Sequence, residues 1–354
     1  MKKHNFSAGP SVLPQEVLKQ ASSAILNFNN LDLSLIEISH RSKDFVAVME
    51  EARSLAIELL GLEGKGYKAL FLQGGASMQF VMAAYNLLEG KAAYLNTGTW
   101  SEKAIAEAKV FGEVVEVASS KDKKHNYIPK NYEVPKGMDY FHCTSNNTIF
   151  GTQIKDFPEV DCPMVSDMSS DIFSRNLDFS KFDLIYAGAQ KNMGPAGTTL
   201  VVVKEDILGK VKRPIPNILS YAQHIAKDSM FNTPPVFAVY TSLLTLRWLK
   251  AQGRISAIEE VNDKKATLIY SEIDLNPLFD GYVAKEDRST MSATFNITNE
   301  KLKPKFDDMV KEAGINGLNG HRSVGGYRAS MYNALSLNSV GVLVDVMSEL
   351  ERTA

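Results

Sequence analysis

The chain has 354 residues, a length that favours two domains, or one large and one small unit, over a single module. Its hydrophobic fraction of 44% and charged fraction of 23% are those of an ordinary globular protein. Lysine and arginine number 39 and aspartate and glutamate 41, so the formal net charge of −2 argues against non-specific binding to nucleic acid or to an anionic membrane.

The chain opens with an arm and a helix. Residues 6–14 are rich in glycine, proline and serine and predict an irregular arm. Residues 42–60 predict a helix that Gly61 stops, because apolar side chains recur there at spacings of three and four residues. These side chains, which share one helix face, are Phe45, Val48, Ala52, Leu55 and Leu59.

From about residue 67, short apolar runs alternate with amphipathic helices, which predicts an α/β domain with a mostly parallel sheet. Ligands of such sheets bind outside the carboxyl ends of the strands, so we expect the functional residues just after each run. The expected strands are residues 68–72, 92–95, 114–117, 140–143, 164–165, 184–186 and 199–203.

The last third of the chain follows a different pattern. After an irregular, proline-rich stretch at 205–235, helices are expected at 236–252 and 255–270. A strand, helix, strand, helix pattern then ends with residues 340–350 and predicts a smaller α+β domain. We therefore divide the chain into an N-terminal arm associated with the small domain, 1–14, a large domain, 15–255, and a small domain, 256–354.

The compartment is inferred from what the sequence lacks. The N-terminus has no apolar run after its lysines, and no stretch of eighteen apolar residues occurs, so we expect a cytoplasmic protein without a membrane segment. The two cysteines, Cys143 and Cys162, are too few for a disulfide scaffold or a cysteine-rich metal site. Because both lie in apolar, strand-like stretches, we expect buried thiols and no metal centre.

The first candidate for chemistry is the turn after the run at 68–72. Gly74 and Gly75 precede the small residues Ala76 and Ser77, which open a helix. Free backbone N–H groups and the positive end of the helix dipole suit such a start to phosphate binding. The pattern is neither a P-loop nor a G-x-G-x-x-G fingerprint, so ATP and NAD lose support. A plain tight turn is the alternative.

Asp167 and Lys191 are the second and third candidates. Asp167 ends an apolar run, where a carboxylate is costly unless paired, and a protonated pyridine nitrogen is one useful partner. A helix N-cap is the commoner explanation for a lone aspartate. Lys191 follows a strand among small residues, where partial desolvation and a nearby cation would lower its pKa and free its amine for Schiff-base chemistry. An ordinary surface lysine is the alternative.

Aromatic and cationic residues complete the set of candidates. Trp100 follows the run at 92–95 and could stack on a flat cofactor, although core packing explains a single tryptophan about as well. Arginines suit carboxylates and phosphates, and surface salt bridges are the alternative for each one singly. The cationic candidates are His40, Arg41, His321, Arg322 and Arg328.

Together these motifs resemble those of the phosphoserine aminotransferases, a family of the class V, fold-type I aminotransferases that use pyridoxal phosphate. The Ala-Gln-Lys-Asn stretch at Lys191 and the Gly-His-Arg-x-Val-Gly-Gly-x-Arg-Ala-Ser stretch from Gly320 are specific, whereas the Gly-Gly-Ala-Ser turn alone is weak. The resemblance runs nearly end to end, through residues 6–10, 37–42, 73–78, 96–101, 145–149, 167–170, 188–197, 231–235, 320–330 and 332–334.

The resemblance implies a large domain with a mostly parallel seven-stranded sheet and a smaller C-terminal α+β domain. It implies pyridoxal phosphate as cofactor, with Lys191 as the Schiff-base lysine, Asp167 at the pyridinium nitrogen and Trp100 stacked on the ring. Thr148 resembles a contact of the ring hydroxyl. The residues similar to phosphate ligands are Gly75, Ala76, Ser77 and Gln190, with Asn232 and Thr233 reaching the phosphate in the neighbouring subunit.

For the substrate, Arg328 resembles the clamp of the α-carboxylate. The residues His40, Arg41, His321 and Arg322 resemble a pocket for the substrate phosphate or for the side-chain carboxylate of glutamate. The implied protein is a homodimer with shared active sites that binds neither nucleic acid nor membrane.

The implied reaction moves the amino group of L-glutamate to 3-phosphohydroxypyruvate and yields 2-oxoglutarate and O-phospho-L-serine, a step of L-serine biosynthesis. Lys191 would act as general base and acid on the α-proton. 4-Phosphohydroxythreonine, of pyridoxine biosynthesis, is a possible further substrate. Two alternatives remain: another class V enzyme with a different acceptor, elimination or desulfuration chemistry, and a non-catalytic dimeric binding protein.

Overall fold

Seven strands form the central sheet of the computed structural model, which describes residues 3–354. Each of the seven predicted runs is one of these strands. Along the sheet the order is β2-β8-β7-β6-β5-β3-β4, and every neighbouring pair is parallel except the two pairs that contain β8. The strands are β2 (Tyr67–Leu72), β3 (Lys91–Asn96), β4 (Glu113–Ser119), β5 (Phe141–Thr144), β6 (Met164–Asp167), β7 (Leu184–Gly188) and β8 (Thr199–Lys204).

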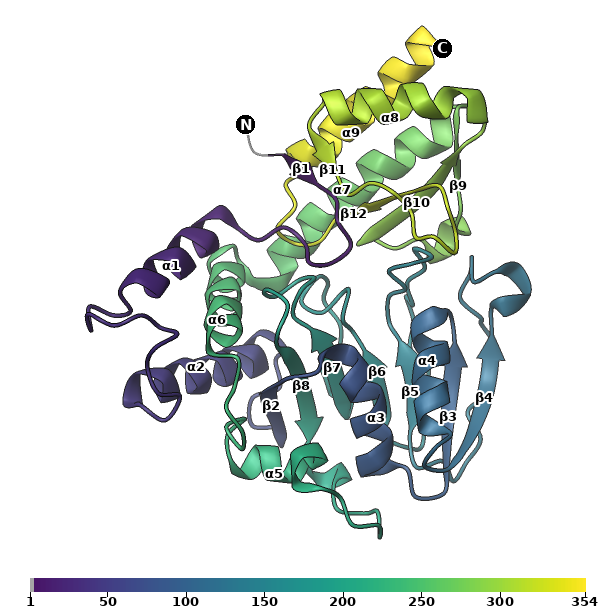
Figure 1. Ribbon diagram of the computed structural model, residues 1–354. Helices are drawn as coiled ribbons and strands as arrows, with labels where there is room; N and C mark the ends of the chain where they lie inside the picture. Colours follow the sequence, from purple (N-terminus) through teal and green to yellow (C-terminus); the bar gives the residue numbers. More distant parts are fainter. Residues whose placement is uncertain (1–2) are drawn as a thin grey trace.

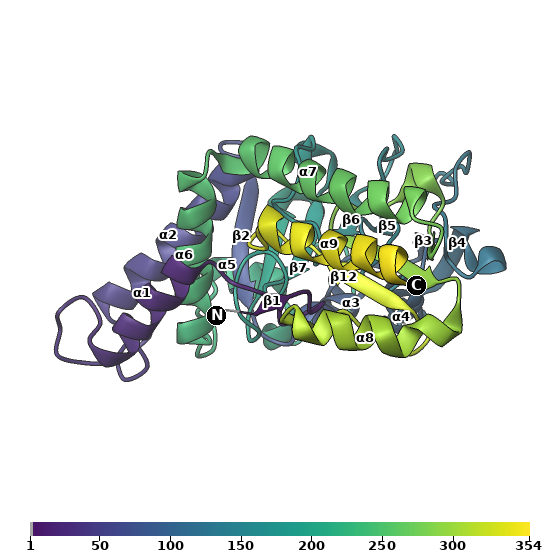
Figure 2. The same ribbon diagram turned by 90° about the horizontal axis from the view of Figure 1, so that it is seen from above.

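Helices cover both faces of this sheet, as Figures 1 and 2 show. Successive residues of a strand point to opposite faces, so Ile185 packs with α2 (Lys43–Leu59) and α6 (Val236–Ala251), and Tyr186 packs on the other face. There it meets α3 (Gly75–Leu87), α4 (Thr99–Ala108) and α5 (Tyr221–Ala226). The predicted helix at 42–60 is α2, whose N-cap is Ser42.

Two helices lie outside the predicted pattern. Helix α1 (Gln15–Leu26) packs against α6 through Val17 and Ala21, and the short α5 falls within the stretch predicted to be irregular. The remaining single turns are 3-10 helices at Lys121–Lys123, Phe179–Lys181, Glu205–Ile207, Asn217–Leu219, Lys285–Asp287 and Glu300–Leu302.

The C-terminal part forms the smaller unit at the top of Figure 1, with the predicted alternation of strand and helix. Its sheet is antiparallel in the order β12-β10-β9. At its side, β1 (His4–Asn5) of the N-terminal arm pairs in parallel with β11 (Ile315–Asn316). The other elements are α7 (Arg254–Leu275), β9 (Phe279–Gly281), β10 (Ser292–Ile297), α8 (Lys303–Glu312), β12 (Tyr327–Ser330) and α9 (Leu337–Thr353).

Helix α7 connects the two hydrophobic interiors. Near its start, Ile255 and Ile258 pack in the core of the large unit, whereas Ile269 and Ile273 pack in the core of the small one. The domain boundary after residue 255, at the start of this continuous helix, stays a prediction.

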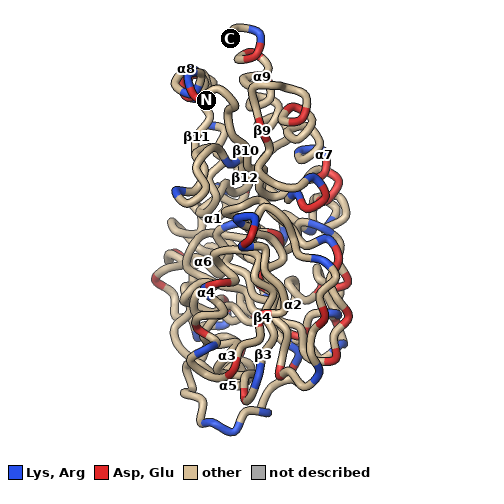
Figure 3. Tube along the Cα trace, turned by 90° about the vertical axis from the view of Figure 1, so that its right-hand side faces the viewer, with Lys and Arg blue, Asp and Glu red and all other residues tan. Residues whose placement is uncertain are grey.

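The surface carries both signs of charge on both units (Figure 3), in keeping with the near-zero balance of the sequence. Within residues 3–354 no helix is long and apolar enough to cross a membrane. Cys143 is buried on β5 as expected, but Cys162 lies in the bend before β6 and is only partly buried, because its segment connects elements at the surface. Both thiols are free.

Candidate active site

A cavity of about 150 Å³ lies at the carboxyl ends of β5 and β6, where the sequence predicts the functional residues. Eight of the ten predicted cofactor-binding residues line it: Gly75, Ala76, Ser77, Trp100, Thr148, Asp167, Gln190 and Lys191. Sequence reasoning missed the four other lining residues, which are Thr144, Asn146, Ser169 and Ser170. Thr144 directly follows the predicted strand at 140–143, and the other three lie two or three residues from Thr148 or Asp167, so their position in sequence was the available signal.

One wall of the cavity is the start of α3. Strand β2 ends at Leu72, and Gly74 turns the chain with φ +94°, so that the first residues of α3 border the cavity. The N–H groups of a first helical turn have no partner within the helix, and the dipole adds positive potential there. This wall can therefore hold a phosphate group.

We expect Gly74→Ala to weaken phosphate binding at this wall and to lower stability. A Cβ atom at Gly74 would lie 2.6 Å from Cβ of Met78 and would sit on a backbone with φ +94°. The free energy of unfolding should fall by about 1–3 kcal/mol. Chemical denaturation and titration with a phosphate-bearing cofactor would measure both effects.

Gly61→Ala is the matched control for this variant. It also has positive φ (+65°), but nothing lies within 4 Å of its added Cβ atom, and it is remote from the cavity. An unchanged cofactor affinity in Gly74→Ala would contradict the role of the α3 start.

Asp167 ends the central strand β6 and is buried. Its carboxylate accepts a hydrogen bond of 2.9 Å from the N–H of Ser169. Burial raises the pKa of Asp167 above its usual value, and the hydrogen bonds from Ser169 and the charge of Lys191 only partly oppose this. A cationic ring N–H facing this carboxylate would relieve that desolvation.

A second buried carboxylate, that of Asp171, is linked to Asp167 through Ser145. Asp171 pairs with Arg175 at 3.0 Å and also accepts a hydrogen bond from the hydroxyl of Ser145. The same hydroxyl and the N–H of Ser145 both donate to the backbone carbonyl of Asp167, at 3.1 and 3.0 Å. This network, which sequence reasoning missed, fixes the end of β6.

Lys191 lines the same cavity as Asp167. Its Nζ donates a hydrogen bond of 2.7 Å to Oγ1 of Thr148 and lies 6.0 Å from the centroid of the Trp100 ring. The pKa of Lys191 is lowered to about 8: burial lowers it most, the charge of Asp167 opposes this, and the charge of Arg328 adds to the lowering. A larger fraction of the amine is therefore neutral than in an ordinary lysine, as covalent and proton-transfer chemistry requires.

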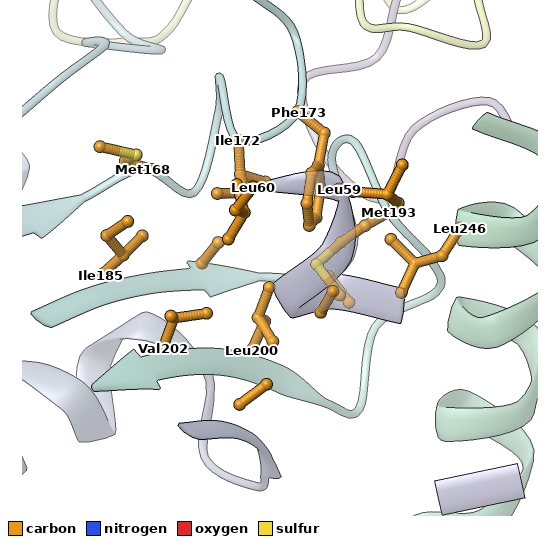
Figure 4. Packing of buried hydrophobic residues seen from close by; sticks show 14 of the residues in the cluster. Leu59, Leu60, Met168, Ile172, Phe173, Ile185, Met193, Leu200, Val202 and Leu246 are labelled. Carbon is orange, nitrogen blue, oxygen red and sulfur yellow. The ribbon is translucent and has the colours of Figure 1, made fainter. Parts of the chain in front are cut away.

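The two segments that carry these groups are anchored in one core. Met168 and Met193, just after Asp167 and Lys191, belong to the same buried cluster as Ile185 and Leu200 (Figure 4). The side chain of Asn192 adds a hydrogen bond of 3.0 Å to the carbonyl of Ser170. Such packing limits the movement of Asp167 and Lys191 relative to each other.

Of the predicted cationic residues, only some are brought close to one another in this chain. Arg328, on β12, is buried and donates to the carbonyl of Thr148 at 3.3 Å, so Thr148 binds both Arg328 and Lys191. Burial lowers the pKa of His321, and so do the charges of Arg328, Arg322 and Lys103. His321 and Arg322 therefore belong to the same cationic group as Arg328.

Lys103 is a member of this group that sequence reasoning missed. Its Nζ lies 4.7 Å from the centroid of the Trp100 ring, an arrangement typical of a cation–π contact. The available signal was the spacing of three residues on α4, which places Trp100 and Lys103 on one helix face.

Seven predicted residues do not line the cavity: Arg328, His321 and Arg322, described above, and His40, Arg41, Asn232 and Thr233. His40 and Arg41 lie just before α2. Thr233 accepts a hydrogen bond of 2.6 Å at its carbonyl from the side chain of Gln73, and Asn232 lines a separate cavity of about 320 Å³ with Gln73 and Gly74. Their predicted roles stay predictions.

Comparisons with known proteins agree with this geometry. The family described as aminotransferase class V matches residues 3–343. A phosphoserine aminotransferase of Flavobacterium johnsoniae is 69% identical over 353 residues, which cover 99% of each chain. A solved structure described as radiation damage of the Schiff base in phosphoserine aminotransferase has a TM-score of 0.96 at 46% identity, with both chains covered completely. A phosphoserine aminotransferase of Trichomonas vaginalis, solved with PLP bound, has a TM-score of 0.93 at 34% identity and covers 98% of this chain and 100% of its own.

Proposed function

Because the chain belongs to the class V aminotransferases, and among them to the phosphoserine aminotransferases, we propose that it transfers the amino group of L-glutamate to 3-phosphohydroxypyruvate, giving O-phospho-L-serine and 2-oxoglutarate. It is a pyridoxal-phosphate enzyme of serine biosynthesis. One observation carries the reaction chemistry: Lys191 and Asp167 line a single cavity together with the first residues of α3.

The cavity fits pyridoxal phosphate by the chemistry of its walls. Asp167 offers a buried carboxylate for the pyridinium nitrogen, and the start of α3 offers N–H groups for the phosphate. The hydroxyl of Thr144, in the cavity wall, is buried without a hydrogen-bond partner among the described residues, as expected for a group that faces a polar ligand. Lys191 would hold the cofactor covalently.

The cofactor, when bound, supplies the electron sink for the electron pair left at the substrate's α-carbon. Lys191 acts as the base: its free Nζ accepts the α-proton and later returns it. The hydrogen bond to Thr148 holds Nζ on the cavity side, and its lowered pKa keeps part of the amine neutral. Asp167, whose buried carboxylate lines the cavity, would hold the ring nitrogen in its protonated form.

The cations account for a substrate pair with two anionic groups each. Arg328 would bind the α-carboxylate, which is supported by its hydrogen bond to the carbonyl of Thr148, whose hydroxyl binds Lys191. His321 and Arg322 would take the substrate phosphate or the distal carboxylate of glutamate, which are similar anions at similar distance. Lys103 adds a positive charge on the large unit.

The same proposal includes a homodimer with shared active sites, in the cytoplasm. It is supported by Asn232 and Thr233, predicted phosphate ligands that do not line the cavity of their own chain. In a dimer, the partner's copies of these two residues would complete the phosphate contacts.

A coupled assay with glutamate and 3-phosphohydroxypyruvate tests the function. The holoenzyme should turn over this pair and should form 2-oxoglutarate. Transfer to another oxo acid but not to 3-phosphohydroxypyruvate would favour another class V activity, and tight cofactor binding without any turnover would favour a binding protein. The same assay with the oxo acid that gives 4-phosphohydroxythreonine decides whether that compound is a further product.

Uptake of pyridoxal phosphate by the apoenzyme should rise with pH and level off above about 8. The pKa of Lys191 is lowered to about 8, and only its neutral amine attacks the cofactor aldehyde. Well below that pKa the rate should rise about tenfold per pH unit, because the neutral fraction does so. Stopped-flow absorbance measures the rate, and a plateau only near the usual pKa of lysine would contradict the assignment.

A further inference from the structure

The N-terminal arm runs from the small unit to the lysine that holds the cofactor. At its beginning, β1 pairs with β11, and the N–H of Phe6 donates to the carbonyl of Asn316 at 2.8 Å. Phe6 is fully buried in the core of the small unit. The hydroxyl of Tyr332 donates to the carbonyl of Ala8 at 2.7 Å. Residues 4–8 are therefore part of the small unit.

Three residues further along, the arm binds the backbone at Lys191. The N–H of Ser11 donates to the carbonyl of Gln190 at 2.9 Å, and its hydroxyl donates to the carbonyl of Lys191 at 2.5 Å. Gly9 approaches the same two residues closely, since a Cβ atom there would lie 3.5 Å from Cγ of both side chains. Helix α1 follows from Gln15 and packs on α6 of the large unit.

We propose that Ser11 is a positioning residue for Lys191 and that the arm ties the lysine to the small unit, which carries Arg328. The inference rests on the proposed function. Ser11 binds two successive carbonyls through its N–H and its hydroxyl, so it fixes the peptide from which the Lys191 side chain leaves. Misplacement of a base by a fraction of an ångström slows proton transfer more than it weakens substrate binding.

The test compares Ser11→Ala and Ser11→Thr with wild type in the half-reaction with glutamate. Ser11→Ala should lower the rate constant about tenfold, leave the KM for glutamate within about twofold, and raise the isotope effect of α-deuterated glutamate, because proton transfer becomes slower. It should also shift the pH midpoint of cofactor uptake by the apoenzyme. Ser11→Thr, which keeps the hydroxyl, should restore most of each property.

Ser23→Ala is the matched control. The hydroxyl of Ser23 also donates to a backbone carbonyl, that of Lys19, but this hydrogen bond lies on the exposed side of helix α1. Unchanged rate, isotope effect and uptake midpoint in Ser11→Ala would overturn the proposal. So would equal losses in Ser11→Ala and Ser11→Thr. The half-reaction uses no 3-phosphohydroxypyruvate, so failure of the proposed phosphoserine activity would be seen separately.

Discussion

Replacing Lys191 by alanine should lower the rate of amino-group transfer by at least about a thousandfold, because the cavity then lacks the amine that accepts the α-proton. Among the described residues that line the cavity, Lys191 is the one lysine, Asp167 is the proposed partner of the ring nitrogen, and Thr148 and the serines there are too weakly basic to accept an α-proton. The yellow absorbance of the lysine-bound cofactor should be lost as well. Single-turnover absorbance with glutamate measures both effects.

A small external amine separates loss of the base from loss of the fold. Removing the Lys191 side chain leaves room beside Thr148, so methylamine should restore part of the rate, and stronger amine bases of equal size should restore more. Lys68→Ala is the control, since Lys68 forms an exposed pair with Glu205 at 3.4 Å. Near-normal transfer in Lys191→Ala without added amine would refute the assignment of the base.

Asp167→Asn should have the second largest effect, a fall of about a hundredfold or more in the rate of the half-reaction. The amide has the shape of the carboxylate but no charge, so it cannot keep a proton on the ring nitrogen. Rapid-scan absorbance with glutamate measures the rate. Asp178→Asn, at an exposed 3-10 cap, serves as control, and more than half of the normal rate in Asp167→Asn would contradict the role.

The apoenzyme of Asp167→Asn should be at least as stable as wild type at neutral pH. Burial raises the pKa of Asp167, so at pH values between the unfolded and the folded pKa the folded chain retains a proton that the unfolded chain has released. Stability contributed by this group is therefore present at low pH and declines as pH rises above the unfolded value, and the amide removes that penalty. Thermal unfolding of both apoproteins measures it. Asp167 thus promotes the reaction but lowers the free energy of unfolding.

The positions of Lys191 and Asp167 could be predicted from sequence because Asp167 ends the buried strand β6 and Lys191 follows the buried strand β7, and the apolar runs of both strands are local signals. Helix α1 was not predicted, although its buried residues Val17, Ala21 and Ala24 recur at spacings of four and three, because two of the three are alanines, whose apolar signal is weak. Lys103 was missed for a different reason: its Nζ is significant only because the ring of Trp100 lies beneath it.

Other parts of the site depend on contacts that no local pattern encodes. The hydrogen bonds from Ser11 to the backbone at Lys191 join residues 180 apart in the chain. The pairing of Asp171 with Arg175 is local, but its value lies in the link through Ser145 to Asp167. Cys162 was expected to be buried because an apolar stretch does not reveal whether it lies in a strand or in the bend before one.

Because β6 lies at the centre of the sheet, the backbone at Asp167 should be less mobile than the backbone at Lys191. Three strands flank β6 on either side, so the backbone amides near Asp167 should exchange with deuterated solvent only when the whole sheet opens. Lys191 instead follows a strand end, and the arm that binds its carbonyl can detach without disturbing that sheet. Under mild denaturant the hydrogen bond from the arm to Lys191 should therefore break first. The backbone at Asp167 should stay protected until the whole protein unfolds.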